Sequence, residues 1–268
     1  MRTISQFIFA IPCLLISIGQ LNAQGPIAGF AVPKGEVAIA INYASEQYDT
    51  YLNPEGNENR ELTALSYSLF VEAGLSDEMA IVASIPYIET NEDNSSLQDA
   101  SLFLKYRNLE SRSGQGRHWI HTAIGATFPI GSYPTDGEAA IGQRAFVFQG
   151  RLVYQYQHDE GWFVSALSGI DFQLSPDSRA VWPVLFRAGY GAPWLYIEGW
   201  LEFVNALDGT QGTETALAGT GSSWTRTGAT VYFPVQPWFG VQVNGAWILD
   251  GEFIGQSTRL GGGVVFKF

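Results

Sequence analysis

The sequence is nearly without cysteine and has no long apolar run outside its amino-terminal end. Its one cysteine, Cys13, lies in that end, so the chain after Ala23 has no thiol for a disulfide, a thiolate metal site or a cysteine nucleophile. After Ala23 no stretch approaches the roughly 18 apolar residues that indicate a membrane-spanning helix. Basic residues are also scarce, and a net charge of -12 argues against nucleic acid as a partner.

The amino-terminal end has the pattern of a secretory signal. Arg2 precedes an apolar run from Phe7 to Ile18, and a short polar segment then leads to Ala23. We therefore expect residues 1–23 to be cleaved and residues 24–268 to fold as a single domain of an exported protein.

Through most of the remaining chain, apolar residues alternate with small or polar ones. Val37, Ile39, Ile41 and Tyr43, for example, are separated by alanines and Asn42. A period of two is typical of β-strands with one apolar face. The alternation predicts about twelve strands, at roughly 36–48, 62–75, 79–90, 97–109, 118–131, 145–157, 161–174, 182–190, 194–206, 223–234, 238–249 and 258–268.

The connections between these strands alternate in length. Most of those after even-numbered strands are tight, as at 76–78 and 191–193, with 110–117 as a longer exception, whereas most of the others are longer, polar and rich in Gly and Asp. Aromatic residues make up 14% of the chain and charged residues only 15%, which is unusual for a soluble secreted domain. The fold class predicted is all-β: a transmembrane up-and-down antiparallel β-barrel of about 12 strands in the bacterial outer membrane, with extracellular long loops and periplasmic termini. A soluble sandwich is the alternative, but it would not explain the two kinds of loop.

The chain stops on an aromatic residue in the middle of a strand pattern. Phe268 ends the alternating segment that includes Gly263 and Phe266. A barrel in lipid cannot leave an edge with unpaired backbone groups, so this strand is expected to close against the first one. The pattern Gly263, Phe266, Phe268 also resembles the terminal signal that the barrel assembly machinery recognises.

Charged residues also occur within the strands, on the face opposite the apolar one. Such charges could not face lipid without a large cost, so they are expected to line the lumen as candidates for selectivity. These candidates are Glu72, Lys105, Arg107, Arg151, Asp171, Arg187, Glu198, Glu202 and Arg226.

Distances from the short turns predict partners among these charges. Arg187 and Glu198 lie nearly equally far from the turn at Ala192, so they are expected almost opposite each other. Glu202 and Arg226 are each about ten residues above their own turns on neighbouring strands. Two interpretations stay open: these pairs satisfy one another inside a packed barrel, or they ring a constriction.

No pattern in the sequence indicates an enzyme. His118 and His121, three positions apart, point to opposite faces of one strand, and His158 lies in a short turn. All three are expected at the inner rim, whereas outer-membrane lipases and proteases would need a histidine near the outer rim. We expect no catalytic site, no metal and no cofactor.

Several short motifs resemble the family of outer-membrane proteins labelled for the meta-pathway of phenol degradation. Two positions depart from the family pattern: Gln98 stands where Gly is usual, and Ile130 where Thr is frequent. The resemblance implies a transporter-like barrel, with small aromatic or hydrophobic compounds as solutes. The motifs, best matched between 62 and 175, are Leu65-Ser66-Tyr67-Ser68-Leu69, Gly74-Leu75-Ser76-Asp77, Ile85-Pro86-Tyr87, Asp99-Ala100-Ser101-Leu102-Phe103-Leu104-Lys105-Tyr106-Arg107 and Phe128-Pro129-Ile130-Gly131.

The function expected from these patterns is a channel in the outer-membrane lipid bilayer for passive passage of a small aromatic, hydrophobic or anionic solute. Bases at Arg151, Arg187 and Arg226 suit an anion, and an interior with Trp200 and Tyr232 suits an aromatic molecule. The alternative is a barrel with a filled lumen that acts as an envelope-structural or surface-binding protein through its acidic extracellular loops.

Overall fold

A computed structural model describes residues 27–268 except 92, 136–139 and 209–220, so the predicted signal segment 1–23 lies outside the described residues. Within the part described, no helix has the length and hydropathy needed to cross a bilayer. The strands are β1 (Val37–Leu52), β2 (Glu58–Gly74), β3 (Met79–Thr90), β4 (Ser95–Leu97), β5 (Asp99–Ser113), β6 (Gly116–Pro129), β7 (Phe146–His158), β8 (Trp162–Ser175), β9 (Arg179–Ala192), β10 (Leu195–Ala206), β11 (Ser223–Gln236), β12 (Phe239–Glu252) and β13 (Ile254–Lys267).

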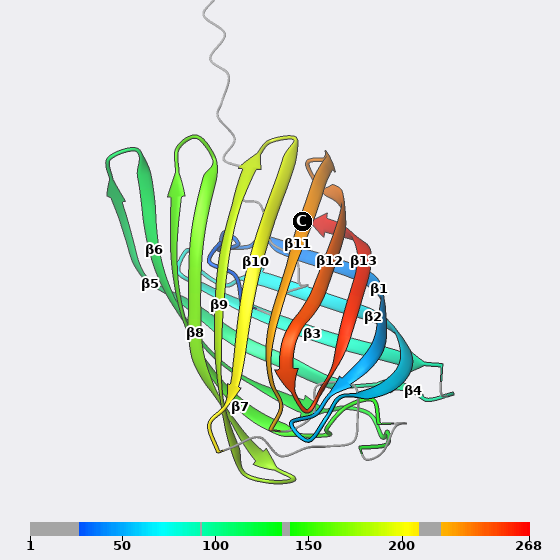
Figure 1. Cartoon of the computed structure of the whole chain (residues 1–268). Coiled ribbons are helices and arrows are strands. Elements are labelled where there is room, and N and C mark those ends of the chain that lie inside the picture. Colours follow the sequence, from blue (N-terminus) through cyan, green and yellow to red (C-terminus); the bar gives the residue numbers. More distant parts are fainter. Residues whose placement is uncertain (1–26, 92, 136–139, 209–220) are drawn as a thin grey trace, which may run out of the picture.

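The strands form one closed antiparallel barrel (Figure 1). Strands that follow each other in the sequence pair with each other, and β1 pairs with both β2 and β13. The short β4 and the long β5 both pair with β3 and are separated only by Gln98, so together they fill one position in the wall. The barrel therefore has twelve strand positions, and the predicted fold class is confirmed.

The alternation in the sequence becomes the two faces of the wall. On β1, Ile41 and Tyr43 are exposed on the outside, while Ala40 and Asn42, the neighbours of Ile41, are buried inside. The same holds on β5, where Leu102 is exposed and Phe103 is buried. An apolar outer band and an interior of mixed polarity are what a barrel in lipid requires.

Closure of the barrel occurs at the last residue. The backbone N–H of Phe268 donates to the carbonyl of Val37, and the N–H of Val37 donates to the carbonyl of Phe268, both at 2.9 Å. The predicted pairing of the last strand with the first is confirmed. Recognition of Gly263, Phe266 and Phe268 by the assembly machinery stays a prediction.

The two rims of the barrel differ. We call the rim that carries Val37 and Phe268 the terminal rim, and the opposite one the loop rim. Turns at the terminal rim are short, and the connections at 53–57, 130–145 and 207–222 lie at the loop rim.

The expected longer connection at 110–117 is wrong. Strand β5 runs to Ser113 and β6 begins at Gly116, with Gly114 in the left-handed conformation (φ 59°) that a tight turn needs. Charged residues at its tip suggested a loop, but they pair across strands: Arg112 Nη2 lies 2.6 Å from Asp159 Oδ2, and Arg117 Nη1 lies 3.9 Å from Glu110 Oε1.

Candidate functional site in the barrel lumen

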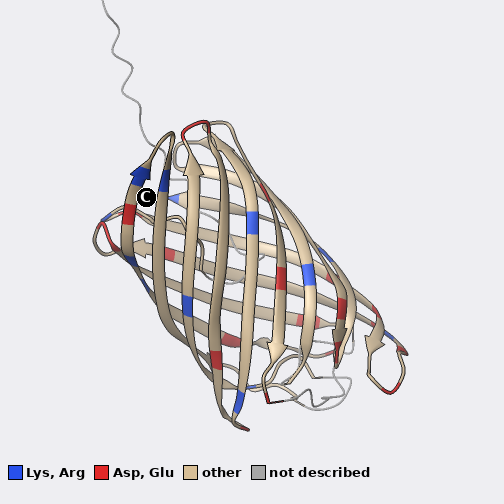
Figure 2. Ribbon diagram, turned by 60° about the vertical axis from the view of Figure 1, so that its left-hand side comes forward, with Lys and Arg blue, Asp and Glu red and all other residues tan. Residues whose placement is uncertain are grey.

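Charged residues are spread along the strands as well as over the loops (Figure 2). Glu72, Lys105, Arg187 and Glu198 are buried on the inner face of the wall. Large aromatic side chains that were expected inside, such as Phe103 and Trp200, are buried there too and belong to one apolar cluster. The lumen is therefore filled by side chains to a large extent rather than being a wide pore.

Near the terminal rim the lumen holds a segment of the chain itself, residues 27–33, which precedes the exposed Lys34 and Gly35 beside Gly74 of β2. Ile27 and Val32 are buried, at 2% and 6% exposure. The Phe30 ring packs edge-on against Phe163 of β8, with 5.1 Å between the ring centroids, and lies 6.4 Å from the ring of Tyr196 on β10. This segment, which we call the inner segment, lies inside the barrel before β1 begins.

Two of the predicted lumen residues hold the inner segment. Lys105 forms a buried ion pair with Glu72, and its ammonium also donates to the carbonyls of Phe30 and Ala28, the latter at 3.4 Å. Arg187 Nη2 donates to the carbonyl of Ile27 at 3.3 Å. These charges therefore satisfy backbone groups that have no strand partner inside the lumen.

Gly29 lets the inner segment approach the wall closely. A Cβ at this position would lie 2.8 Å from Cβ of Gln155 on β7 and 2.2 Å from its amide oxygen, so no larger residue fits without movement. The backbone of the inner segment therefore fits closely against β7 only because residue 29 is a glycine.

The expected pairing of Arg187 with Glu198 needs correction. The register places Arg187 opposite Trp200 and Glu198 opposite Gly189, so the two charged residues are diagonal rather than facing. Glu198 Oε2 accepts a hydrogen bond from the Tyr196 hydroxyl at 2.8 Å. Counting from Ala192 overlooked that Ala192 itself pairs with Leu195, which moves the partner of Arg187 by two residues, from Glu198 to Trp200.

The expected pairing of Glu202 with Arg226 is confirmed. The two residues face each other on β10 and β11, and Arg226 Nη2 and Nε both donate to Glu202 Oε2, at 2.7 and 3.0 Å. The guanidinium also lies over the ring of Trp200, 5.4 Å from its centroid. This pair lies farther from the terminal rim than the inner segment does.

Arg151 and Asp171 form a further ion pair, on β7 and β8. Arg151 Nη2 donates to Asp171 Oδ2 at 3.0 Å, and Nη1 bonds the other carboxylate oxygen. Gly169 makes room for it, because a Cβ there would lie 2.9 Å from Cδ of Arg151. Arg107, the remaining candidate, pairs with Glu110 at 2.9 Å close to the terminal rim.

A fourth lumen ion pair involves a residue that the sequence reasoning missed. Glu46 of β1 accepts from Ser257 Oγ at 2.6 Å and lies 3.5 Å from Arg259 Nη1 of β13. Arg259 Nη2 donates to Ser66 Oγ at 2.9 Å. Glu46 occupies the same alternating face as Asn42, so the period of two would have found it.

The described parts of the connection between β6 and β7, residues 130–135 and 140–145, fold into the mouth at the loop rim. Ile141 is 1% exposed, and the Tyr133 hydroxyl donates to the carboxylate of Asp99, which also accepts from the N–H of Ala145 at 3.3 Å. Burial, together with this carboxylate, raises the pKa of Tyr133, so its hydroxyl keeps the proton that it donates. Nothing in the polar loop sequence predicted this inward fold.

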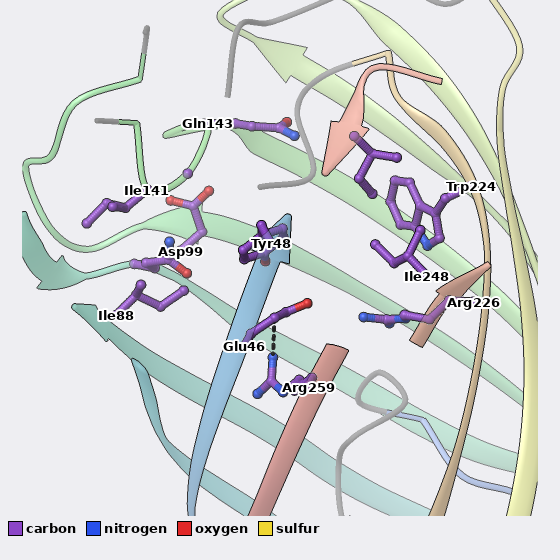
Figure 3. A pocket seen from close by; sticks show the side chains of 13 residues that line it. Glu46, Tyr48, Ile88, Asp99, Ile141, Gln143, Trp224, Arg226, Ile248 and Arg259 are labelled. Atoms are coloured by element: carbon purple, nitrogen blue, oxygen red, sulfur yellow. Dashed lines mark hydrogen bonds and ion pairs between the residues drawn. The ribbon is translucent and has the colours of Figure 1, made fainter. Parts of the chain in front are cut away.

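Inside the barrel, beside this loop, lies a cavity of about 270 Å³, which we call the chamber (Figure 3). Glu46 and Tyr48 enter it from β1, Trp224 and Arg226 from β11, and Arg259 from β13. Ion-paired, aromatic and aliphatic side chains thus share its lining.

The histidines lie where the sequence placed them. His121 is 1% exposed on the inner face, His118 is outside with its ring 4.9 Å from that of Tyr156, and His158 stacks on Trp162. Over the described residues, no three His, Cys, Asp or Glu side chains gather in a way that could hold a metal ion.

Comparisons with known proteins agree with this architecture. The sequence model of a family described as "Putative MetA-pathway of phenol degradation" matches residues 22–268. A comparison with curated proteins gives no match. An outer membrane channel from Pseudomonas putida F1 superimposes with a TM-score of 0.72 at 15% identity, covering 91% of this chain and 99% of that one. The NanC porin gives a TM-score of 0.58 at 10% identity, covering 86% of this chain and 100% of that one. The KdgM porin gives 0.52 at 9% identity, covering 85% and 99%.

Proposed function

Because the chain belongs to the family of the MetA-pathway of phenol degradation, we propose that it is an outer membrane channel through which a small solute passes passively. The observation that carries this proposal is the chamber, a space inside a closed barrel that is lined by polar and aromatic groups. A barrel that served only as a scaffold would gain stability by filling this space, because empty volume in a core is costly.

The barrel spans the outer membrane with its loop rim outside the cell and its terminal rim in the periplasm. Support comes from the length of the loop-rim connections and from the short turns at the other rim, which are the usual arrangement in bacterial barrels. In this orientation a solute enters the chamber first and meets the inner segment next.

The solute class follows from the chamber and from the family. Aromatic and aliphatic side chains alternate with ion pairs around the chamber, which favours a small molecule with an apolar part. A chemical reaction is not part of the proposal, since the histidines lie at the rim opposite the loops or face the inner segment.

The inner segment favours a second candidate function. Because residues 27–33 pack against the interior of the wall, the protein would be a closed barrel that acts through its loops if the segment never moves. The two candidates differ in one measurable property, the passage of ions and solutes.

A reversible cross-link tests the proposal. The chain after Ala23 has no cysteine, so Gly29→Cys with Gln155→Cys introduces the only two thiols. An ideal Cβ at 29 lies 2.8 Å from Cβ of Gln155, so a shift of about 1 Å reaches the roughly 3.5–4.5 Å that a disulfide needs. Conductance is measured in planar bilayers before and after reduction, with Gly29→Cys alone as the control.

We expect the oxidised protein to be nearly silent and the reduced protein to conduct, while the control does not respond to reductant. Absence of conductance in the parent protein and in both redox forms would favour the closed-barrel function instead. Equal conductance in the two forms would mean that solutes pass beside the inner segment rather than displacing it.

A further inference from the structure

A second cavity, of about 500 Å³, lies at the loop rim, and we call it the rim groove. Its lining comes from the turn after β1, at Asn53 and Pro54, and from the loop-rim ends of β10, β11 and β12. Trp224 lines both the rim groove and the chamber, so the two cavities are neighbours. The volume is within the roughly 300–1,000 Å³ of pockets that bind organic molecules, and it exceeds what a single ion needs.

Hydrogen-bonding side chains of three kinds line the rim groove. Amides, hydroxyls and carboxylates contribute two each, and none of the described lining residues is basic. An anion would therefore meet carboxylates without a counter-charge, which disfavours phosphates and sugar acids. The six side chains are those of Asn53, Asn205, Ser223, Thr225, Asp250 and Glu252.

Three of these side chains are held in place by backbone N–H groups. Asn53 Oδ1 accepts from the N–H of Glu55 at 3.1 Å, and Ser223 Oγ accepts from the N–H of Ala206 at 3.0 Å. Asp250 Oδ1 accepts from the N–H that follows it in the chain at 2.9 Å. A side chain already held in one orientation loses little conformational freedom when a ligand binds, so these contacts preorganise the lining.

A metal ion and an organic amine fit this lining less well than a hydroxyl-rich ligand does. The described residues hold no group of three His, Cys, Asp or Glu side chains placed to bind a metal ion. An ammonium group only donates, so the amide N–H groups of Asn53 and Asn205 would gain no acceptor from it. A sugar hydroxyl both donates and accepts, and it therefore matches amides, hydroxyls and carboxylates together. Pro54 and Trp224 add apolar surface for the C–H groups of a sugar ring.

We propose that the rim groove binds a neutral, hydroxyl-rich saccharide at the mouth of the barrel. The Asp250 carboxylate accepts hydrogen bonds from the sugar hydroxyls, and the Asn205 amide both donates to them and accepts from them. A free oligosaccharide and the sugar part of a glycolipid in the surrounding leaflet offer the same chemistry. This site goes beyond the proposed channel function, because binding here does not require the sugar to pass through the barrel.

Three trisaccharides of similar size test the class of ligand. Maltotriose is neutral, the chitosan trimer carries amines, and trigalacturonate carries carboxylates. Their affinities for the purified chain in phospholipid nanodiscs are measured by calorimetry, with empty nanodiscs as the background. A second set of nanodiscs contains lipopolysaccharide: weaker maltotriose binding there identifies the glycolipid as the source of the sugar, and unchanged binding identifies a free saccharide.

Two variants each remove one polar side chain from the lining. Asp250→Ala removes a carboxylate and Asn205→Ala removes an amide, and both residues are exposed, so the packing of the barrel is kept. The matched control is Asp49→Ala, because Asp49 is an exposed carboxylate in the loop-rim half of β1 and does not belong to the described lining. Heat-modifiability on gels verifies that each variant is a folded barrel.

We expect maltotriose to bind more tightly than the other two probes, to lose roughly tenfold in affinity in each lining variant, and to keep its affinity in Asp49→Ala. Absence of maltotriose binding, tighter binding of either charged probe, or unchanged maltotriose affinity in both folded lining variants would overturn the inference. Conductance is recorded on the same samples: a conducting protein without this binding pattern leaves the channel standing and removes the site, whereas the binding pattern without any conductance does the reverse.

Discussion

Replacing Phe30 with alanine should open the channel more often. The Phe30 ring packs against Phe163 and Tyr196 and anchors the inner segment in the lumen. The size of the effect depends on how stably the segment is held, which can be worked out from its contacts.

Three apolar side chains of the segment, Ile27, Phe30 and Val32, each contribute about 1.5–3 kcal/mol by leaving water. Three of its carbonyls accept hydrogen bonds from Lys105 or Arg187, at about 1.5–3 kcal/mol each for a charged donor. Releasing seven residues returns about 1–2 kcal/mol of conformational entropy per residue. The stabilising contacts and the entropy of release are therefore of similar size, so the loss of a single large contact should shift the balance between the inserted and the displaced state measurably.

Phe30→Ala removes about 2–3 kcal/mol of this preference, counting burial and the aromatic contacts. The ratio of displaced to inserted molecules should then rise by a factor of roughly 30 to 150. Open probability in single-channel recordings measures this directly. Phe186→Ala is the matched control, because Phe186 is 50% exposed on the outer face of β9.

An additional test joins Phe30→Ala to the Gly29→Cys and Gln155→Cys pair. Oxidation should return the open probability to a low value, since the segment is then tied to β7. A folded Phe30→Ala protein with the same open probability as its parent would show that the inner segment does not control the passage of ions. The stability of the inserted segment would then have no bearing on conductance.

Three further predictions concern selectivity, assembly and orientation. Glu202→Ala should shift permeability toward anions and Arg226→Ala toward cations, each by roughly fivefold or more for an ion that passes about 4 Å away, with the double variant near the parent ratio; unchanged reversal potentials in both single variants would place the pair off the conduction path. Deleting Phe268 should reduce heat-modifiable, membrane-inserted protein while export continues, because the closing backbone bonds at the terminal rim are lost; normal insertion would contradict this. A tag at Asn57 should be labelled on intact cells and one at Asp159 should not, and the opposite result would invert the proposed orientation.

The wall of the barrel could be predicted from the sequence because the pattern that determines it involves only neighbouring residues. A period of two fixes which residues face lipid, and turn residues fix where a strand reverses, so Ile41 and Asn42 could be assigned to opposite faces without any long-range information. The same logic places Glu202 opposite Arg226. It fails by two residues at Arg187 and Glu198, where the exact length of one turn decides the register.

The contents of the lumen follow much less from the sequence. The inner segment and the loop 130–145 have no repeating pattern, and their positions depend on contacts with residues more than 40 positions away, such as those of Phe30 with Lys105 and of Ala145 with Asp99. The sequence did hold one signal for the inner segment. Ile27, Phe30 and Val32 are apolar residues that precede the first strand and belong to no strand themselves. Apolar residues without a strand partner need another surface, and the aromatic interior near Phe163 supplies it.

Pairing of the lumen charges explains how one interior can carry many charged residues without presenting a free charge to a solute. A lone arginine in a narrow lumen would attract every anion and repel every cation, whereas a guanidinium held 2.7 Å from a carboxylate projects only a short-range dipole. The ion pairs thus keep the strands in register and make the wall polar without giving the chamber a net field. In the proposed channel, discrimination among solutes should then depend on the volume of the chamber and on its aliphatic lining rather than on a free charge. The predicted change of ion selectivity in the Glu202→Ala and Arg226→Ala variants then measures the electrostatic field of one unpaired charge, which its partner cancels in the parent protein.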